Sequence, residues 1–405
     1  MGSGTNKLRI VWICHFLNQS IREKLGIGIK EKEYAPWIAL GLEEVRKRDD
    51  IELHVIAPFH GIIKDQKFSE GNIHFHCIRT GVPYLKTDWP SFLRFDLWTS
   101  FYFFNYKVRN LIYRINPDLI DLHGAENAYY ASSVLSIKNY PVLVTIQGFL
   151  SLNEVNESKN PYIRKRLIVE KRILETMKYF GIEANFMGDY IRRFNPNAKI
   201  FFFRVPYAKL SAKTSIQKVY DIVFFAKLVR QKGIEDLINA VSIVSRLRPE
   251  ISLVIIGKGK EAYVRFLKQL IDDLGLKSNV IFKGFIPAQE EMLEEVLKAR
   301  ISVLPTYNDT IPGTVVESMH LHIPVISYNV GGVPDLNQDG ERIIIVEKGN
   351  IERLASEIDE LLGNEQKRIQ LAERAFRYVS DEFDNANSIN KLIMAYKDIL
   401  KEVNG

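Results

Sequence analysis

Short apolar runs rich in β-branched residues alternate with longer segments of helical periodicity along almost the whole chain. Runs such as residues 8–14, 222–225 and 253–256 are almost continuously apolar, which is typical of strands buried on both faces of a parallel sheet. Repeated strand–helix alternation predicts a doubly wound α/β fold.

The expected strands divide evenly between the two halves of the chain. The expected strands are residues 8–14, 51–57, 73–78, 119–122, 142–146 and 200–204 in the first half, and 221–225, 253–256, 280–282, 301–304, 325–327 and 343–346 in the second. The expected helices are residues 34–48, 92–115, 161–178, 234–247, 262–274, 289–298, 314–321 and 351–362.

The length of the chain and one break in this alternation predict two domains. At 405 residues the chain is too long for one ordinary core and suits two domains of roughly 200 residues each. Pro206 is followed by a polar stretch, and the strand–helix pattern restarts at Tyr220. Ligands bind outside the carboxyl ends of the strands in such sheets, so two of them facing each other would form one central cleft. We expect Rossmann-like domains over 5–205 and 206–386, and a C-terminal helix over 387–405 that packs back on the first.

Composition limits the cellular compartment and the kinds of partner to be expected. The chain has only two cysteines and no run near the roughly 20 apolar residues of a spanning helix, so we expect a cytoplasmic protein. Residues 1–205 carry 29 Lys and Arg against 21 Asp and Glu, whereas the remainder carries 26 against 28. The basic half favours an anionic partner, either a membrane surface or a phosphate-bearing substrate. Nucleic acid is not expected, because no recognition motif or zinc pattern is present.

The segment 305–319 should follow a strand and open a helix. A Pro312-Gly313 helix start leaves backbone N–H groups free to bind an anion, with help from the helix dipole. Asp309 lies in the loop and Glu317 lies about one turn into the helix. Two carboxylates so placed can hold sugar hydroxyls on either side of a phosphate. The alternative is a solvated loop aspartate and a helix glutamate with no ligand.

Three other strand ends carry candidate binding residues. Lys227 and Lys232 lie across a strand-to-helix turn, where two ammonium groups would neutralise a diphosphate, although basic residues often edge such loops without this role. The turn at Gly257 lacks the third glycine of the dinucleotide fingerprint and the later acidic residue, which counts against NAD. Phe285 follows a further strand end, where backbone groups would meet a base.

These four segments, in this order and spacing, resemble the donor domain of GT-B glycosyltransferases, particularly retaining family 4. The resemblance is strong over residues 220–347 and extends over the whole chain in architecture. It implies that Asp309 meets the transferred sugar and that Glu317 holds the ribose hydroxyls. It also places Lys227 and Lys232 on the diphosphate. The remaining donor-binding residues that it implies are Gly257, Phe285, Gly313, Thr314 and Val315.

Two departures from the family pattern are present. Asp309 replaces the usual Glu and is one methylene shorter, so it would reach the sugar differently or through water. Lys227 replaces the commoner Arg and loses bidentate geometry toward phosphate. A double-glycine first loop is poorly formed around residues 26–28, which leaves donor contacts from that loop in doubt.

The N-terminal half supplies the expected acceptor side. His123 follows a strand, at a position where the family often carries a histidine near the acceptor, and we expect Glu126 and Gln147 to line the same cleft. A histidine that fills a strand end is the alternative. His15, His60, His74 and His76 show no metal-ligand spacing, and we expect them to be structural or exposed, with no metal site.

Residues 92–114 are unusually aromatic, with basic side chains interleaved. An interfacial membrane helix has this composition, and so does a helix whose aromatic face packs on the sheet. We favour the packed interpretation.

The resemblance implies transfer of a sugar from a nucleoside diphosphate to an acceptor hydroxyl, with retained configuration and no cofactor. The expected catalytic residues are His123, Asp309 and Lys232. No Asp-x-Asp motif offers a metal site. The expected partners are a nucleotide sugar, a saccharide or lipid-linked saccharide acceptor, and an anionic membrane surface on the inner face of the cytoplasmic membrane. Two alternatives stay open: a sugar-nucleotide epimerase of the same fold, and a non-catalytic sugar-nucleotide-binding protein.

Overall fold

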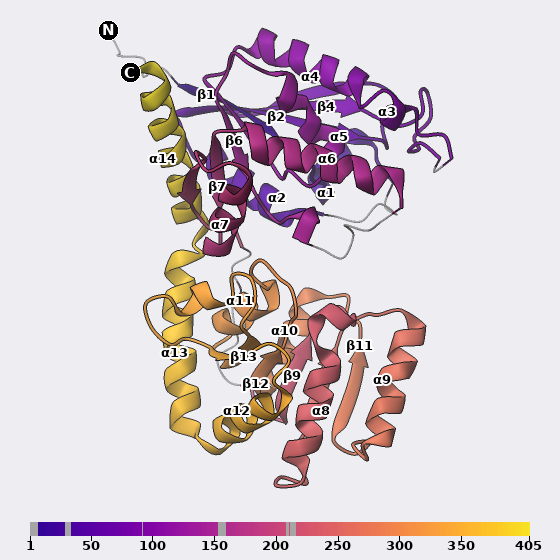
Figure 1. Cartoon of the computed structure of the whole chain (residues 1–405), viewed down its shortest axis with the longest axis vertical. Coiled ribbons are helices and arrows are strands. Elements are labelled where there is room, and N and C mark those ends of the chain that lie inside the picture. Colours follow the sequence, from indigo (N-terminus) through magenta and orange to yellow (C-terminus); the bar gives the residue numbers. More distant parts are fainter. Residues whose placement is uncertain (1–6, 29–33, 91, 153–158, 208–209, 211–215) are drawn as a thin grey trace. The chain divides into compact units, whose positions relative to one another are not determined.

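The computed structural model describes residues 7–28, 34–90, 92–152, 159–207, 210 and 216–405 (Figure 1). The chain divides into two compact units, one of residues 1–208 and 383–405 and the other of residues 209–382. The sequence-based boundaries lay at 205/206 and 386/387, and most of the polar stretch after Pro206 lies outside the described residues. Among the described residues, no helix combines the length and apolar character that crossing a membrane requires.

The first unit is built on an eight-stranded sheet of order β3-β4-β2-β1-β5-β6-β7-β8. All neighbouring strands are parallel except the antiparallel pair β3–β4. The sequence did not predict β3 or β7. The strands are β1 (Leu8–Ile13), β2 (Ile51–Phe59), β3 (Gln66–Glu70), β4 (Ile73–Arg79), β5 (Leu119–His123), β6 (Val142–Thr145), β7 (Tyr179–Ile182) and β8 (Lys199–Phe202).

Eight α-helices of the first unit have described bounds: α1 (Gln19–Leu25), α2 (Pro36–Arg46), α3 (Phe95–Trp98), α4 (Tyr102–Ile115), α5 (Ala128–Ala131), α6 (Pro161–Thr176), α7 (Asn185–Phe194) and α14 (Asn385–Asn404). The last of these contacts α2, and it places Ile389, Leu392 and Tyr396 in the core around Trp12. The C-terminal end of the chain is therefore part of the first unit.

The single helix expected over 92–115 is wrong. Ser100 and Phe101 have positive φ angles of 52° and 61°, which interrupt the helix between α3 and α4. The expected packing of the aromatic face is also wrong for most of these residues, because only Phe101 and Phe104 are buried. The other aromatic side chains of the segment are exposed: Phe92, Phe95, Trp98, Tyr102, Phe103, Tyr106 and Tyr113.

The second unit is built on a six-stranded parallel sheet of order β11-β10-β9-β12-β13-β14. The strands are β9 (Tyr220–Phe225), β10 (Leu253–Ile256), β11 (Val280–Gly284), β12 (Ala299–Leu304), β13 (Val325–Tyr328) and β14 (Ile344–Val346). The helices are α8 (Ile234–Ser245), α9 (Glu261–Asp273), α10 (Gln289–Leu297), α11 (Gly313–His320), α12 (Ile351–Gly363) and α13 (Glu365–Glu382), and their strand–helix alternation is the Rossmann-like pattern (Figure 1).

Candidate functional site

The strand order of the second unit creates a topological switch point beside β9. The chain passes from β9 to β10 on one side, whereas β12 pairs with β9 on the other side. Because all six strands are parallel, the loops after β9, β10, β11 and β12 leave the same edge of the sheet. Ligands of such folds bind at this edge. The four segments singled out from the sequence are these loops.

Lys232 and Asp309 form the best-defined contact at this edge. The Lys232 Nζ atom lies 2.7 Å from both carboxylate oxygens of Asp309. The buried Thr306 hydroxyl donates a further hydrogen bond of 2.6 Å to Asp309 Oδ2. Both members of the ion pair keep some exposure, 23% for Lys232 and 18% for Asp309, so a ligand can reach them.

Close backbone contacts fix the loops that carry this ion pair. Gly233 has a φ of 70°, and a Cβ atom there would lie 1.8 Å from the carbonyl oxygen of Pro305. Gly331, in the loop after β13, has a φ of 52°, and its Cβ would lie 1.8 Å from the carbonyl oxygen of Asp309. Only glycine permits these approaches. These contacts fix the positions of Lys232 and Asp309 relative to each other.

Tyr307 ties the loop after β12 to the first turn of α8. Its hydroxyl donates a hydrogen bond of 2.6 Å to Asp236 Oδ2, and the Tyr328 hydroxyl donates one of 2.8 Å to the same oxygen. The Tyr307 amide also donates to the Gln231 carbonyl oxygen at 2.8 Å. The two loops that carry the ion pair are thereby joined beside the pair itself.

The start of α11 carries backbone amides and a partly buried carboxyl group. Pro312 is the N-cap and provides no side-chain cap, so the amides of Gly313 and Thr314 have no side-chain partner from that residue. The Val315 amide already donates to the Pro312 carbonyl oxygen at 3.0 Å, which makes it less suited to the phosphate than expected. Burial raises the pKa of Glu317. A ligand that donates hydrogen bonds to this carboxylate would compensate for its lost hydration.

The other expected donor residues lie at the same edge. A Cβ atom at Gly257 would lie 1.9 Å from the Ala226 carbonyl oxygen, so the loops after β9 and β10 touch there. Lys227 is exposed in the loop after β9. Phe285 directly follows β11 and is 61% exposed. The structure places these three residues after the ends of β9, β10 and β11.

In the first unit, the expected residue His123 ends β5 beside a buried carboxylate. Asp121 is fully buried, and its Oδ2 atom lies 3.4 Å from His123 Nε2. Asp121 accepts a hydrogen bond of 2.8 Å from the Thr145 hydroxyl and one of 2.5 Å from the Tyr396 hydroxyl. Tyr396 in turn accepts a hydrogen bond of 2.8 Å from Trp12 Nε1. This buried network joins β1, β5, β6 and α14.

Packing against Trp12 fixes the orientation of the His123 ring. It lies against the Trp12 ring, with centroids 4.6 Å apart, and its Nε2 atom makes no hydrogen bond to the described residues. Burial lowers the pKa of His123, although the Asp121 carboxylate opposes this shift. The imidazole is therefore neutral near pH 7 and retains a nitrogen for another partner.

Glu126 and Gln147 lie in the loops after β5 and β6. Burial raises the pKa of Glu126 to about 7. Its Oε2 atom is buried and has no hydrogen-bond partner among the described residues, and its backbone carbonyl accepts from Arg166 at 2.7 Å. The sequence left donor contacts from the first loop, around residues 26–28, in doubt. Residues 29–33, which come next, lie outside the described residues.

Comparison with known proteins bears on the two units differently. Residues 208–378, the second unit almost entirely, match the glycosyl transferases group 1 family. An uncharacterized glycosyltransferase of Methanocaldococcus jannaschii is 25% identical over 379 residues, which cover 91% of this chain and 95% of that protein. The second unit therefore carries a glycosyl transferases group 1 domain, and the chain is similar to a glycosyltransferase over most of its length.

Solved structures show that the GT-B fold extends over both units of the chain. Sucrose-phosphate synthase from Thermosynechococcus elongatus superposes with a TM-score of 0.68 at 17% identity, covering 98% of this chain and all of the other. Anabaena HepE, solved in complex with UDP, gives a TM-score of 0.64 at 15% identity, with 98% of this chain covered and all of HepE. At these identities the likeness concerns the GT-B fold.

Sequence reasoning missed several residues that shape the candidate sites. The Gly331-Gly332 pair, four residues after the end of an expected strand, was an available signal for a close backbone approach. Thr306, Asp236 and Tyr396 offered no such signal, because their roles depend on contacts between distant loops and helices.

Proposed function

We propose that this protein is a glycosyltransferase that transfers a sugar from a nucleoside diphosphate to an acceptor hydroxyl with retention of configuration. The observation that carries the proposal is the Lys232–Asp309 ion pair at the topological switch point of the group 1 domain. An ammonium group and a carboxylate at this edge match a phosphate and a sugar hydroxyl of one donor.

The donor would extend along the edge of the sheet from β11 to α11. Phe285 would meet the base, and Glu317 would accept hydrogen bonds from the ribose hydroxyls. The Gly313 and Thr314 amides would bind the distal phosphate at the positive end of the helix dipole. The solved complexes of HepE with UDP and with UDP-glucose support a uridine nucleotide as the first donor to test.

The reaction would depend on stabilising the leaving group. Negative charge develops on the diphosphate as the glycosidic bond breaks, and Lys232, Lys227 and the α11 amides would neutralise it. The proposal includes front-face attack, in which the diphosphate helps to take the acceptor proton, and it requires no metal ion. His123 would act on the acceptor side, held by the Asp121 network.

A saccharide or lipid-linked saccharide is the proposed acceptor. One relative is a capsular polysaccharide biosynthesis glycosyltransferase of Staphylococcus aureus, 26% identical over 190 residues, which cover 45% of this chain and 47% of that protein. We propose that synthesis of a cell-surface polymer is the context, and that the enzyme works at the inner face of the cytoplasmic membrane.

The exposed aromatic side chains of α3 and α4 support attachment to an anionic membrane surface. Trp98 is 74% exposed, and the unit that carries it has an excess of basic residues. Flotation with liposomes at low salt should require anionic lipid and should weaken in Trp98→Ala. Leu247→Ala is the matched control, since Leu247 is also 74% exposed but lies in the second unit. Flotation that depends neither on anionic lipid nor on Trp98 would contradict this attachment.

A two-step assay tests the main proposal. A thermal-shift panel of sugar nucleotides should identify a donor, because a ligand at a hundred times its dissociation constant stabilises the folded chain by about 2.7 kcal/mol. That donor should then yield a glycoside and free nucleoside diphosphate only when an acceptor is present. Conversion to a different free sugar nucleotide without acceptor would indicate an epimerase, and binding without any turnover would indicate a sugar-nucleotide sensor.

A further inference from the structure

Four side chains of metal-binding types share one face of the sheet in the first unit. Glu52 and His54 are two residues apart on β2, and His74 and His76 are two residues apart on β4. Side chains at this spacing point to the same face of a strand. The parallel register pairs His54 with His74 and so brings the two strands' polar side chains together.

Three of these side chains converge on one point. One ligand atom from each of Glu52, His54 and His74 lies within 4.8 Å of the other two. His54 Nε2 is 3.1 Å from Glu52 Oε1, and His74 Nε2 is 3.9 Å from the same oxygen. Ligands that share a tetrahedral zinc ion at roughly 2.0–2.2 Å lie about 3.3 Å apart. Small side-chain movements would therefore complete three corners of such a site.

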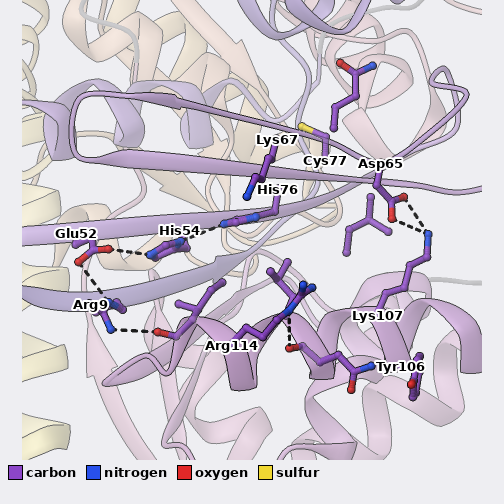
Figure 2. A pocket seen from close by; sticks show the side chains of 15 residues that line it. Arg9, Glu52, His54, Asp65, Lys67, His76, Cys77, Tyr106, Lys107 and Arg114 are labelled. Atoms are coloured by element: carbon purple, nitrogen blue, oxygen red, sulfur yellow. Dashed lines mark hydrogen bonds and ion pairs between the residues drawn. The ribbon is translucent and has the colours of Figure 1, made fainter.

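Each of the three candidate ligands also contacts a polar side chain outside this set of three. The His54 Nδ1 atom lies 3.1 Å from His76 Nε2, and the His74 Nδ1 atom lies 2.8 Å from the Ser69 hydroxyl. Arg9 Nε donates a hydrogen bond of 3.3 Å to Glu52 Oε2, which leaves Oε1 on the side of the histidines (Figure 2). Such outer partners orient the ring nitrogens and carboxylate oxygens of metal sites.

The cluster has access to solvent. Glu52 and His54 border a cavity of about 670 Å³ between the sheet and α4, whose lining includes Arg9, His76 and Arg114 (Figure 2). The side chains of Glu52 and His74 are 28% and 33% exposed. A metal ion could enter from this side, and water would fill its fourth position.

We propose that Glu52, His54 and His74 form a binding site for a divalent transition metal of the zinc class. Two imidazoles and one carboxylate are a donor set that suits zinc and its neighbours rather than calcium or magnesium. A bound ion would link β2 to β4 near the amino ends of these strands, away from the carboxyl ends where the fold binds its substrates. Its role would be to stabilise the first unit.

The test uses the full chain, stripped with a chelator and titrated with zinc chloride alone in a calorimeter. Wild type should bind one zinc ion, and zinc should raise its melting temperature. Glu52→Gln and His54→Ala should each lower the affinity at least about 100-fold and abolish the thermal shift. Ser69→Ala should lower it about 10-fold, because it removes only an outer partner. Cobalt titration should give the visible absorption of a tetrahedral site in wild type and in His322→Asn, but not in Glu52→Gln or His54→Ala.

Controls separate this site from general histidine binding and from unfolding. His322→Asn is the matched control: His322 lies in the second unit, 3.6 Å from Glu373, and asparagine tolerates its positive φ of 54°. It should bind zinc like wild type. Melting in chelator shows whether each variant folds, and His74→Asn replaces His54→Ala if the latter does not. Absence of zinc binding by wild type, or equal binding by the folded site variants, overturns the proposal.

Discussion

The ammonium nitrogen of Lys232 lies 2.7 Å from each carboxylate oxygen of Asp309, so the cation is shared evenly between the two oxygens. The pair joins the loop after β9 to the loop after β12, across the switch point of the sheet. A phosphate that enters this site must compete with Asp309 for Lys232. The ion pair therefore keeps the lysine in place before the donor binds.

Lys232→Ala should weaken the binding of a nucleoside diphosphate by about 1.5–3 kcal/mol, the range for a hydrogen bond to a charged group. Binding of the nucleoside, which has no phosphate, should change much less. Calorimetric titration of both ligands measures the difference. Lys277→Ala is the control, because Lys277 is exposed before β11, at the other end of the strands. An equal loss for both ligands would show that Lys232 is not a phosphate contact.

Glu126→Gln should change how stability depends on pH. Burial raises the pKa of Glu126 from 4.5 to about 7 in the folded chain. The folded state then binds the proton more tightly than the unfolded state, so wild-type stability falls as pH rises from 4.5 through 7. The cost of the ionised group reaches about 3 kcal/mol above that window.

Melting temperatures at pH 5 and pH 8 measure this effect. Glutamine does not titrate, so the variant should gain stability relative to wild type at pH 8, and the gain should shrink at pH 5. Glu373→Gln is a control, since Glu373 is 45% exposed. A stability difference that is the same at both pH values would contradict the raised pKa.

The strands were largely predictable because their apolar runs are almost uninterrupted. Two strands, β3 and β7, were not predicted, and each has a physical reason. The sequence of β3, Gln66–Glu70, is mostly polar and half exposed, since this strand is the antiparallel edge of the sheet. The sequence of β7 contains Gly181, whose missing side chain leaves room for the Phe203 ring. The β3 sequence has no apolar run, and the apolar run of β7 is only four residues long and is interrupted by glycine.

The donor loops were predictable because each directly follows a strand and carries charged or glycine residues. The networks around them were not. Asp121 and Tyr396 are 275 residues apart in sequence, and only the return of α14 to the first unit brings them together. The Glu52–His54–His74 cluster depends on the register of two strands, which local spacing does not give.

Tyr396→Phe should separate the support of His123 from donor binding. The change removes the hydroxyl that donates to Asp121 at 2.5 Å and accepts from Trp12 at 2.8 Å. Leaving these buried groups without a partner should cost about 1–3 kcal/mol of stability. Sugar transfer should also fall, because Asp121 lies 3.4 Å from His123.

His123→Ala serves as the comparison for that variant. It should lower transfer at least as much, and neither variant should change the affinity for the donor nucleotide, whose proposed residues lie in the second unit. Transfer rates and calorimetric affinities decide the matter. If His123→Ala transferred sugar at the wild-type rate, the role of His123 would be structural only.

Glu317 and Asp309 should divide the recognition of the donor between them. Glu317 lies in the second turn of α11, so its side chain is directed back toward the loop that carries Asp309. Burial raises its pKa, and ribose hydroxyl donors would favour its charged form. Glu317→Gln keeps the size but removes the charge. It should weaken every donor built on the same nucleotide by about 1.5–3 kcal/mol, whichever sugar is attached.

Asp309→Asn should act on the sugar instead. The variant should discriminate between donors that differ in the position of one sugar hydroxyl. The bare nucleoside diphosphate should bind at least as tightly as before, because its phosphate no longer competes with a carboxylate for Lys232. The amide oxygen of the new side chain can still accept from the Thr306 hydroxyl, which donates to Asp309 at 2.6 Å, so the loop should keep its conformation. Competition binding with a set of sugar nucleotides measures both variants. If both weaken the bare nucleotide equally, this division between sugar and ribose is refuted. If neither changes binding or transfer, the donor does not lie at the switch point of this sheet.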